Sequence, residues 1–104
     1  MESRTLGTQG FTSSAIALGC MAMSGTYGPA DDKESLFTIH EAIERGVTVL
    51  DTADFYGMGH NELLIRDAIR GKRDKVLLSV KFGAMRDFTG AFLGTDARPA
   101  AVRN

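Results

Sequence analysis

Three short apolar runs along the chain predict three buried strands. They occupy residues 16–18, 47–50 and 76–80, and the second is rich in β-branched side chains. Short apolar runs bounded by turn residues are typical of strands that are covered on both faces. The three strand regions end at Gly19, Asp51 and Lys81, and these positions are about 30 residues apart. The spacing predicts a repeated unit of strand, loop and helix.

The two stretches between these strands have apolar residues at helical spacing. The first begins at Asp31, followed three residues later by Glu34, which is similar to a capping box. The second begins at Asn61, which we expect to be the N-cap. Gly46 and Gly71 supply left-handed stops. The two apolar stripes are Leu36, Ile39, Ala42 and Ile43, and Leu64, Ile65, Ala68 and Ile69.

The flanking segments have different patterns. Turn formers at Gly7 and Gly10 predict an N-terminal hairpin within residues 1–14. Residues 82–104 contain four Gly or Pro residues and are expected to form a loop, with a possible helix start at 98–104. The expected organisation is a single partial domain over residues 1–104, with three β-strands and two helices in residues 15–81.

Strands that alternate with single helices imply parallel pairing through right-handed crossovers. Two α/β architectures use this βαβαβ pattern, the (β/α)₈ barrel and the doubly wound sheet. A barrel needs about 250 residues, whereas this chain has 104. If it is a barrel, we expect an incomplete one, consisting of the N-terminal hairpin and the first three strands.

Composition and charge exclude several classes of function. There are 12 Lys and Arg residues against 13 Asp and Glu residues, and this balance argues against nucleic-acid binding. Cys20 is the only cysteine, so an internal disulfide and a multi-cysteine zinc site are excluded, and a cytoplasmic location is favoured. The apolar run at residues 15–23 is broken by Gly19, and no stretch reaches the roughly 20 apolar residues of a membrane span. We expect no membrane partner.

Polar side chains stand where function is expected in either architecture, at the carboxyl ends of the strands. Asp51 and Lys81 end neighbouring parallel strands, which lie roughly 4.8 Å apart, so an ion pair can form. Tyr56 follows in a glycine-flanked loop that can fold back over this pair. A cation beside a phenol favours the phenolate and makes the phenol a better proton donor. Each residue also has a structural interpretation: Asp51 as a turn residue, Lys81 as a solvated strand end and Tyr56 as a loop anchor.

Competing motifs are weaker. Gly57 and Gly59 open a dinucleotide fingerprint, but Glu62 stands where its third glycine belongs. No phosphate-binding GxxxxGK sequence occurs. His40 and His60 have no second histidine or cysteine at metal-ligand spacing, so no metal site is expected. Cys20 is either a reactive thiol or, as we favour, a small buried apolar residue.

Two segments resemble the N-terminal third of an aldo-keto reductase, and the similarity extends over residues 4–83. They read LGCMAMSGTYG and GVTVLDTADFYGMGHNELLIRDAIRGKRDKVLLSVKFG. The resemblance implies a (β/α)₈ barrel closed at its base by a short hairpin. It also implies reduction of small carbonyl substrates with NADPH, NADH not being excluded.

The resemblance also implies roles for individual residues. Tyr56 would be the general acid, Lys81 would tune it, and Asp51 would hold Lys81. Gly19, Cys20 and Met21 would approach the nicotinamide ribose of the cofactor, as would Asp51.

The resemblance is incomplete. The family's catalytic histidine and its adenosine-phosphate-binding segments would fall beyond Asn104. We therefore expect no turnover by the isolated 104 residues. One alternative is a non-catalytic remnant or interaction module that associates through its open sheet. Another is a self-contained three-stranded binding domain.

Overall fold

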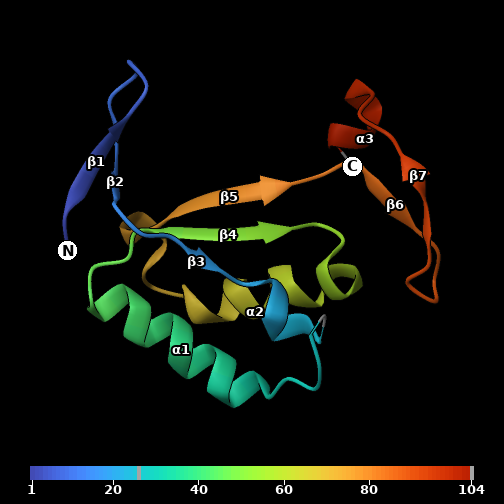
Figure 1. Ribbon diagram of the computed structural model, residues 1–104, viewed down its shortest axis with the longest axis horizontal. Helices are drawn as coiled ribbons and strands as arrows, with labels where there is room; N and C mark the ends of the chain where they lie inside the picture. The colour runs from blue at the N-terminus through green and yellow to red at the C-terminus, as the bar shows by residue number, and fades with distance from the viewer. Residues whose placement is uncertain (26, 104) are drawn as a thin grey trace.

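A three-stranded parallel sheet forms the centre of the computed structural model, which describes residues 1–25 and 27–103 (Figure 1). Its strands are β3 (Leu18–Gly19), β4 (Val49–Ala53) and β5 (Leu77–Lys81), in the order β3-β4-β5. The register places Gly19 beside Asp51 and Ala53 beside Lys81. The predicted βαβαβ arrangement with parallel pairing is confirmed.

Two helices, α1 (Asp32–Glu44) and α2 (His60–Ala68), cover the same face of this sheet (Figure 1). Side chains from both helices and from β4 form the core beneath them, where Ile39 and Leu50 are fully buried. The other core members are Cys20, Ile65, Ala68, Ile69 and Val76. The opposite face of the sheet has no helix over it among the described residues.

The helix starts differ from one another. Asp31 caps α1 as expected, because its carboxylate accepts a hydrogen bond from the Lys33 amide at 2.9 Å. Asn61 is not the N-cap of α2, so that expectation was wrong. A short 3₁₀ turn, η2 (Tyr56–Gly59), leads directly into the helix, and Gly59, with φ +99°, occupies the cap position.

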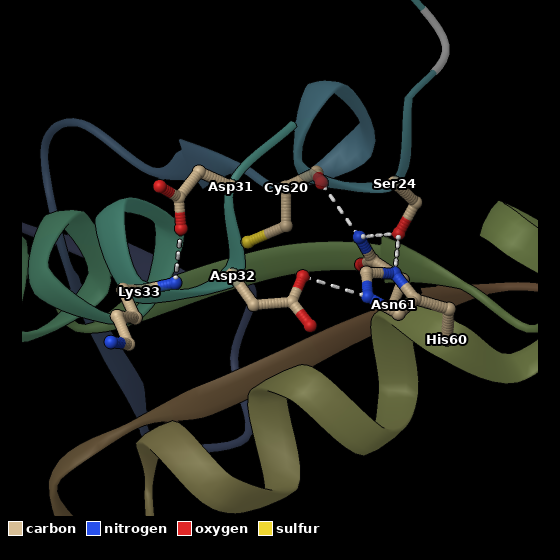
Figure 2. A network of polar contacts seen from close by, with 7 residues as sticks. All are labelled: Cys20, Ser24, Asp31, Asp32, Lys33, His60 and Asn61. Atoms are coloured by element: carbon tan, nitrogen blue, oxygen red, sulfur yellow. Dashed lines mark hydrogen bonds and ion pairs between the residues drawn. The ribbon is translucent and has the colours of Figure 1, made fainter. Parts of the chain in front are cut away.

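Asn61 instead lies in the first turn of α2 (Figure 2). Its side chain is fully buried. Its amide nitrogen donates to the Cys20 carbonyl at 2.7 Å and to Ser24 Oγ at 2.8 Å. Its amide oxygen accepts from Thr52 Oγ1 at 2.6 Å. A single side chain therefore ties together α2, strand β4 and the 3₁₀ turn η1 (Met21–Ser24).

A hairpin flanks the sheet at its N-terminal side. It consists of β1 (Ser3–Leu6) and β2 (Phe11–Ser14), which are antiparallel. Two reciprocal hydrogen bonds between Ser14 and Thr48 attach the hairpin to the residue that precedes β4. The hairpin thus stands at the end of the sheet where the parallel strands begin (Figure 1).

Residues 82–103, the described part of the segment expected to form a loop, contain more regular structure than a loop. They form a second antiparallel hairpin, β6 (Ala84–Arg86) and β7 (Phe92–Thr95), followed by α3 (Pro99–Arg103). The turn is built by Asp87, whose carboxylate accepts from the amides of Thr89 and Ala91. Gly90 adopts φ +86° beside it. The hairpin lies beyond the carboxyl end of β5 (Figure 1).

None of the helices in the described part of the chain combines the length and the apolar character that crossing a bilayer requires.

Replacement of Asn61 by alanine is expected to lower the free energy of unfolding by about 2–4 kcal/mol. The loss leaves the Thr52 hydroxyl and the Cys20 carbonyl without their partner in a buried position and opens a cavity. Urea unfolding followed by circular dichroism measures this change. Leu63→Ala, on the exposed side of the same helix, is the control and should cost under about 0.5 kcal/mol. Equal costs for the two variants would contradict a special role for the Asn61 amide.

Candidate active site

Asp51 and Lys81 meet at the carboxyl ends of the central strands. Lys81 Nζ lies 2.5 Å from Asp51 Oδ2, and the two side chains are partly exposed. They reach this position because successive residues of a strand point to opposite faces. Leu50 and Thr52 are buried on the helix side of β4, whereas Asp51 projects from the uncovered face. Residues that are 30 positions apart in the sequence thus form an ion pair.

The ion pair shifts both members away from their ordinary titration ranges. The hydrogen bond from Lys81 holds the pKa of the Asp51 carboxyl below its usual value. In turn, the hydrogen bond to Asp51, and secondarily the interaction with the Tyr56 hydroxyl, raises the pKa of the Lys81 ammonium. Lys81 is therefore a cation at every physiological pH.

Tyr56 packs against this cation. It begins η2, only 8% of its surface is exposed, and the centroid of its ring lies 5.3 Å from Lys81 Nζ. The Phe55 ring meets it edge-on, with 5.2 Å between the ring centroids. The structure thus brings together Asp51, Tyr56 and Lys81, the three side chains that the sequence singled out.

The segment from Gly19 to Met21 runs beside these residues. Gly19 is exposed, and its α-carbon faces open space, with no atom within 4 Å of where a Cβ would stand. Met21 lines a cavity together with Tyr56. An open backbone position next to a half-buried methionine fits a flat ring or a sugar that approaches the main chain. These residues therefore suit the nicotinamide ribose that the resemblance implies.

Cys20 differs from its two neighbours because it faces the core. Its amide donates to the Asp51 carbonyl at 2.9 Å, and its carbonyl accepts from Asn61. The side chain is fully buried, and this burial raises the pKa of the thiol to about 11. The interpretation of Cys20 as a small buried side chain is confirmed, because the residue is fully buried in the core.

Polar contacts beside Asn61 hold this segment in place (Figure 2). Ser24 Oγ lies 2.8 Å from His60 Nδ1, and His60 Nε2 lies 2.9 Å from Asp32 Oδ1. The Ser24 oxygen also accepts from Asn61, so its two contacts join η1 to the start of α2, and the contact of His60 with Asp32 joins α2 to the start of α1. Sequence reasoning missed this network because its members are distant in the chain and no motif spans them. Within the described residues, no cluster of metal-ligating side chains forms.

A cavity of about 260 Å³ opens beside Tyr56. Its lining residues are Met21, Phe55, Tyr56, Gly57, Met58, Arg86 and Gly90. Arg86 belongs to β6, a strand that the sequence did not predict, so it was not among the candidate residues. A larger cavity of about 520 Å³ lies between α2 and β5, and none of Asp51, Tyr56 and Lys81 lines it. Of these three residues, Tyr56 lines the smaller cavity.

Comparison with known proteins places this geometry in context. The family model described as "Aldo/keto reductase family" matches residues 15–102. The chain is 42% identical over 86 residues to "Probable aldo-keto reductase 1" of Glycine max. The aligned region covers 80% of this chain and 25% of that protein. It is also 42% identical over 84 residues to aldo-keto reductase YhdN of Bacillus subtilis (strain 168), covering 78% of this chain and 25% of that protein. The chain thus spans about a quarter of the length of the curated relatives it matches.

Solved structures agree with this match. The aldo-keto reductase AKR11C1 from Bacillus halodurans, in its holo form, superposes with a TM-score of 0.84 at 30% identity, covering 99% of this chain and 33% of that one. An aldo-keto reductase from Klebsiella pneumoniae in complex with NADPH superposes with a TM-score of 0.60 at 35% identity, covering 66% of this chain and 24% of that one. The fold is that of the first part of a barrel, and the chain belongs to the aldo/keto reductase family.

Proposed function

We propose that this chain supplies the proton-donating part of an NADPH-dependent reductase that converts aldehydes or ketones to alcohols. The observation that carries the proposal is the position of the Lys81 ammonium between the Asp51 carboxylate and the Tyr56 ring. A phenol held beside a fixed cation is suited to give its proton to a carbonyl oxygen, because the cation stabilises the phenolate that remains.

The cofactor assignment is supported by the open Gly19 backbone, by Met21 beside Tyr56, and by the NADPH complex of the Klebsiella pneumoniae relative. When bound, NADPH supplies the hydride that adds to the carbonyl carbon. Gly19 and Met21, with the Asp51 side chain nearby, would hold its nicotinamide end. The Cys20 backbone helps indirectly, because its hydrogen bond to Asp51 fixes the distance between β3 and β4.

The residues of the chain account for the proton in this reaction. As the carbonyl carbon gains the hydride, its oxygen takes the proton of the Tyr56 hydroxyl, and the product is an alcohol. Lys81 stabilises the negative charge left on the Tyr56 oxygen. Asp51 keeps the Lys81 ammonium in place, so that little reorganisation is needed at the moment of transfer. Tyr56 then recovers a proton from water.

Tyr56→Phe should abolish the reduction, with a fall in kcat of at least about 100-fold, because the proton donor is lost while the ring packing is kept. The assay follows the loss of NADPH absorbance with a reactive aromatic aldehyde. The wild type and both variants are produced in the native source. Tyr27→Phe is the matched control, since Tyr27 is 78% exposed. Full activity in Tyr56→Phe would rule out the assigned proton donor, and equal rates with NADH would rule out a preference for NADPH.

The contribution of Asp51 to stability should depend on pH. Its folded-state pKa is lowered, so the stabilisation is present above the unfolded value near 3.8 and is lost as the pH falls through the lower folded value. Thermal unfolding of the wild type and Asp51→Asn between pH 2 and pH 7 measures this loss. Because the ion pair is partly exposed, we expect the free energy of unfolding of the two proteins to differ by less than about 1 kcal/mol at neutral pH. This difference should vanish in acid. A difference that grows in acid would contradict the ion-pair explanation.

The edge of the sheet favours a second candidate function, association with another copy of the chain. Strand β5 is the last strand of the order β3-β4-β5, so one of its backbone edges has no partner strand among the described residues. Val80 and Phe82 are about half exposed there. An apolar strand edge without a partner pairs readily with another chain.

Self-association of this kind should be visible by sedimentation, as a sedimentation coefficient that rises with protein concentration. Val80→Lys should suppress it, because a charge on an edge strand opposes pairing. Leu63→Lys, on the exposed side of α2, should leave it unchanged. A monomer at all concentrations would eliminate this second candidate.

A further inference from the structure

Arg86 places a positive charge in the same cavity as Tyr56. It is the last residue of β6, and it lines the 260 Å³ cavity together with the proposed proton donor. Its guanidinium carbon lies 5.5 Å from the centroid of the Phe55 ring. Phe55 also contacts Tyr56, so the cation and the phenol flank one aromatic side chain.

The charge of Arg86 has no acidic partner among the residues described. The one hydrogen bond seen from its guanidinium goes from Nη1 to the Gly90 carbonyl at 2.8 Å. That bond fixes the side chain across the β6–β7 turn and leaves other donors of the planar fork for a ligand. The nearest acid in sequence, Asp87, uses its carboxylate on Thr89 and Ala91. Asp54 lines an adjoining cavity that Arg86 also lines.

The rest of the cavity wall is largely apolar. Met21, Met58 and Phe55 offer two thioethers and an aromatic ring, which suit a hydrophobic or aromatic body. An arginine fork at one side of such a pocket recognises a carboxylate through two parallel hydrogen bonds. The pocket therefore combines an apolar wall, one anion-binding group and one proton donor.

We propose that the preferred substrates are carbonyl compounds that carry a carboxylate, with Arg86 binding the carboxylate while Tyr56 faces the carbonyl oxygen. This inference rests on the proposed reductase function for the carbonyl end of the molecule. The anion site at Arg86 is testable without turnover.

The probes are 4-carboxybenzaldehyde and its methyl ester, which share the ring and the aldehyde and differ in charge. Binding of each to the cofactor-free chain is followed by NMR chemical shifts. The value of kcat/KM with NADPH is measured on the protein and its variants produced in the native source, because we expect no turnover by the isolated 104 residues. We expect the acid to bind about tenfold more tightly than the ester. Arg86→Met should remove this preference, and Arg86→Lys should keep part of it. Arg45→Met, an exposed change of equal charge on the end of α1, should preserve it.

A preference for the acid that survives in Arg86→Met, or no preference in the wild type, would overturn the inference. If Arg86-dependent binding of the acid occurs but NADPH is not oxidised with either aldehyde, the anion site is supported and the reductase assignment fails. If both aldehydes are reduced at equal kcat/KM, the reductase assignment stands and the carboxylate preference is refuted. Circular dichroism of each variant shows that a loss of binding is not a loss of fold.

Discussion

The alternation of side chains along β4 couples the core of this protein to its chemistry. Thr52 faces the helices and donates to buried Asn61, whereas the preceding residue, Asp51, faces the other way and binds Lys81. A shift of register by one residue would bury Asp51 and expose Thr52, so neither contact would survive. Asn61 in turn holds the Cys20 carbonyl and Ser24, which fixes the segment beside the site. The packing beneath the sheet therefore helps to position the segment beside the site.

The position of Tyr56 depends on a tight backbone turn that follows it. Gly57 has φ +61° and Met58 has φ +55°, both in the left-handed region. A Cβ on Gly57 would stand 2.9 Å from Ser24 Cβ and 3.0 Å from His60 Cβ, too close for any other residue. The turn packs against η1, the element that Asn61 also holds. Tyr56 is thus directed at Lys81 by contacts between segments that are distant in the chain.

These contacts explain what the sequence could and could not predict. Periodicity identified the three strands, and the rule that parallel strands end at one edge of a sheet predicted the pairing of Asp51 with Lys81. The burial of Asn61 was not predictable, because the same residue type at a helix start is usually a cap and its three partners are not local. The second hairpin was missed because the four Gly and Pro residues between positions 82 and 104 outweighed the signal of the short β6 and β7 strands. Arg86 was missed with it.

The two cations Lys81 and Arg86 have different electrostatic surroundings. Lys81 is paired with Asp51 at 2.5 Å, and its ammonium lies 5.3 Å from the centroid of the Tyr56 ring. Arg86 packs on Phe55, has no acidic partner among the described residues, and lines the cavity beside Tyr56. A paired cation is suited to tune a neighbouring proton donor, and an unpaired one is suited to attract an anion. Lys81 ends strand β5 and Arg86 ends strand β6, so the backbone sets the separation at which the two proposed functions would act.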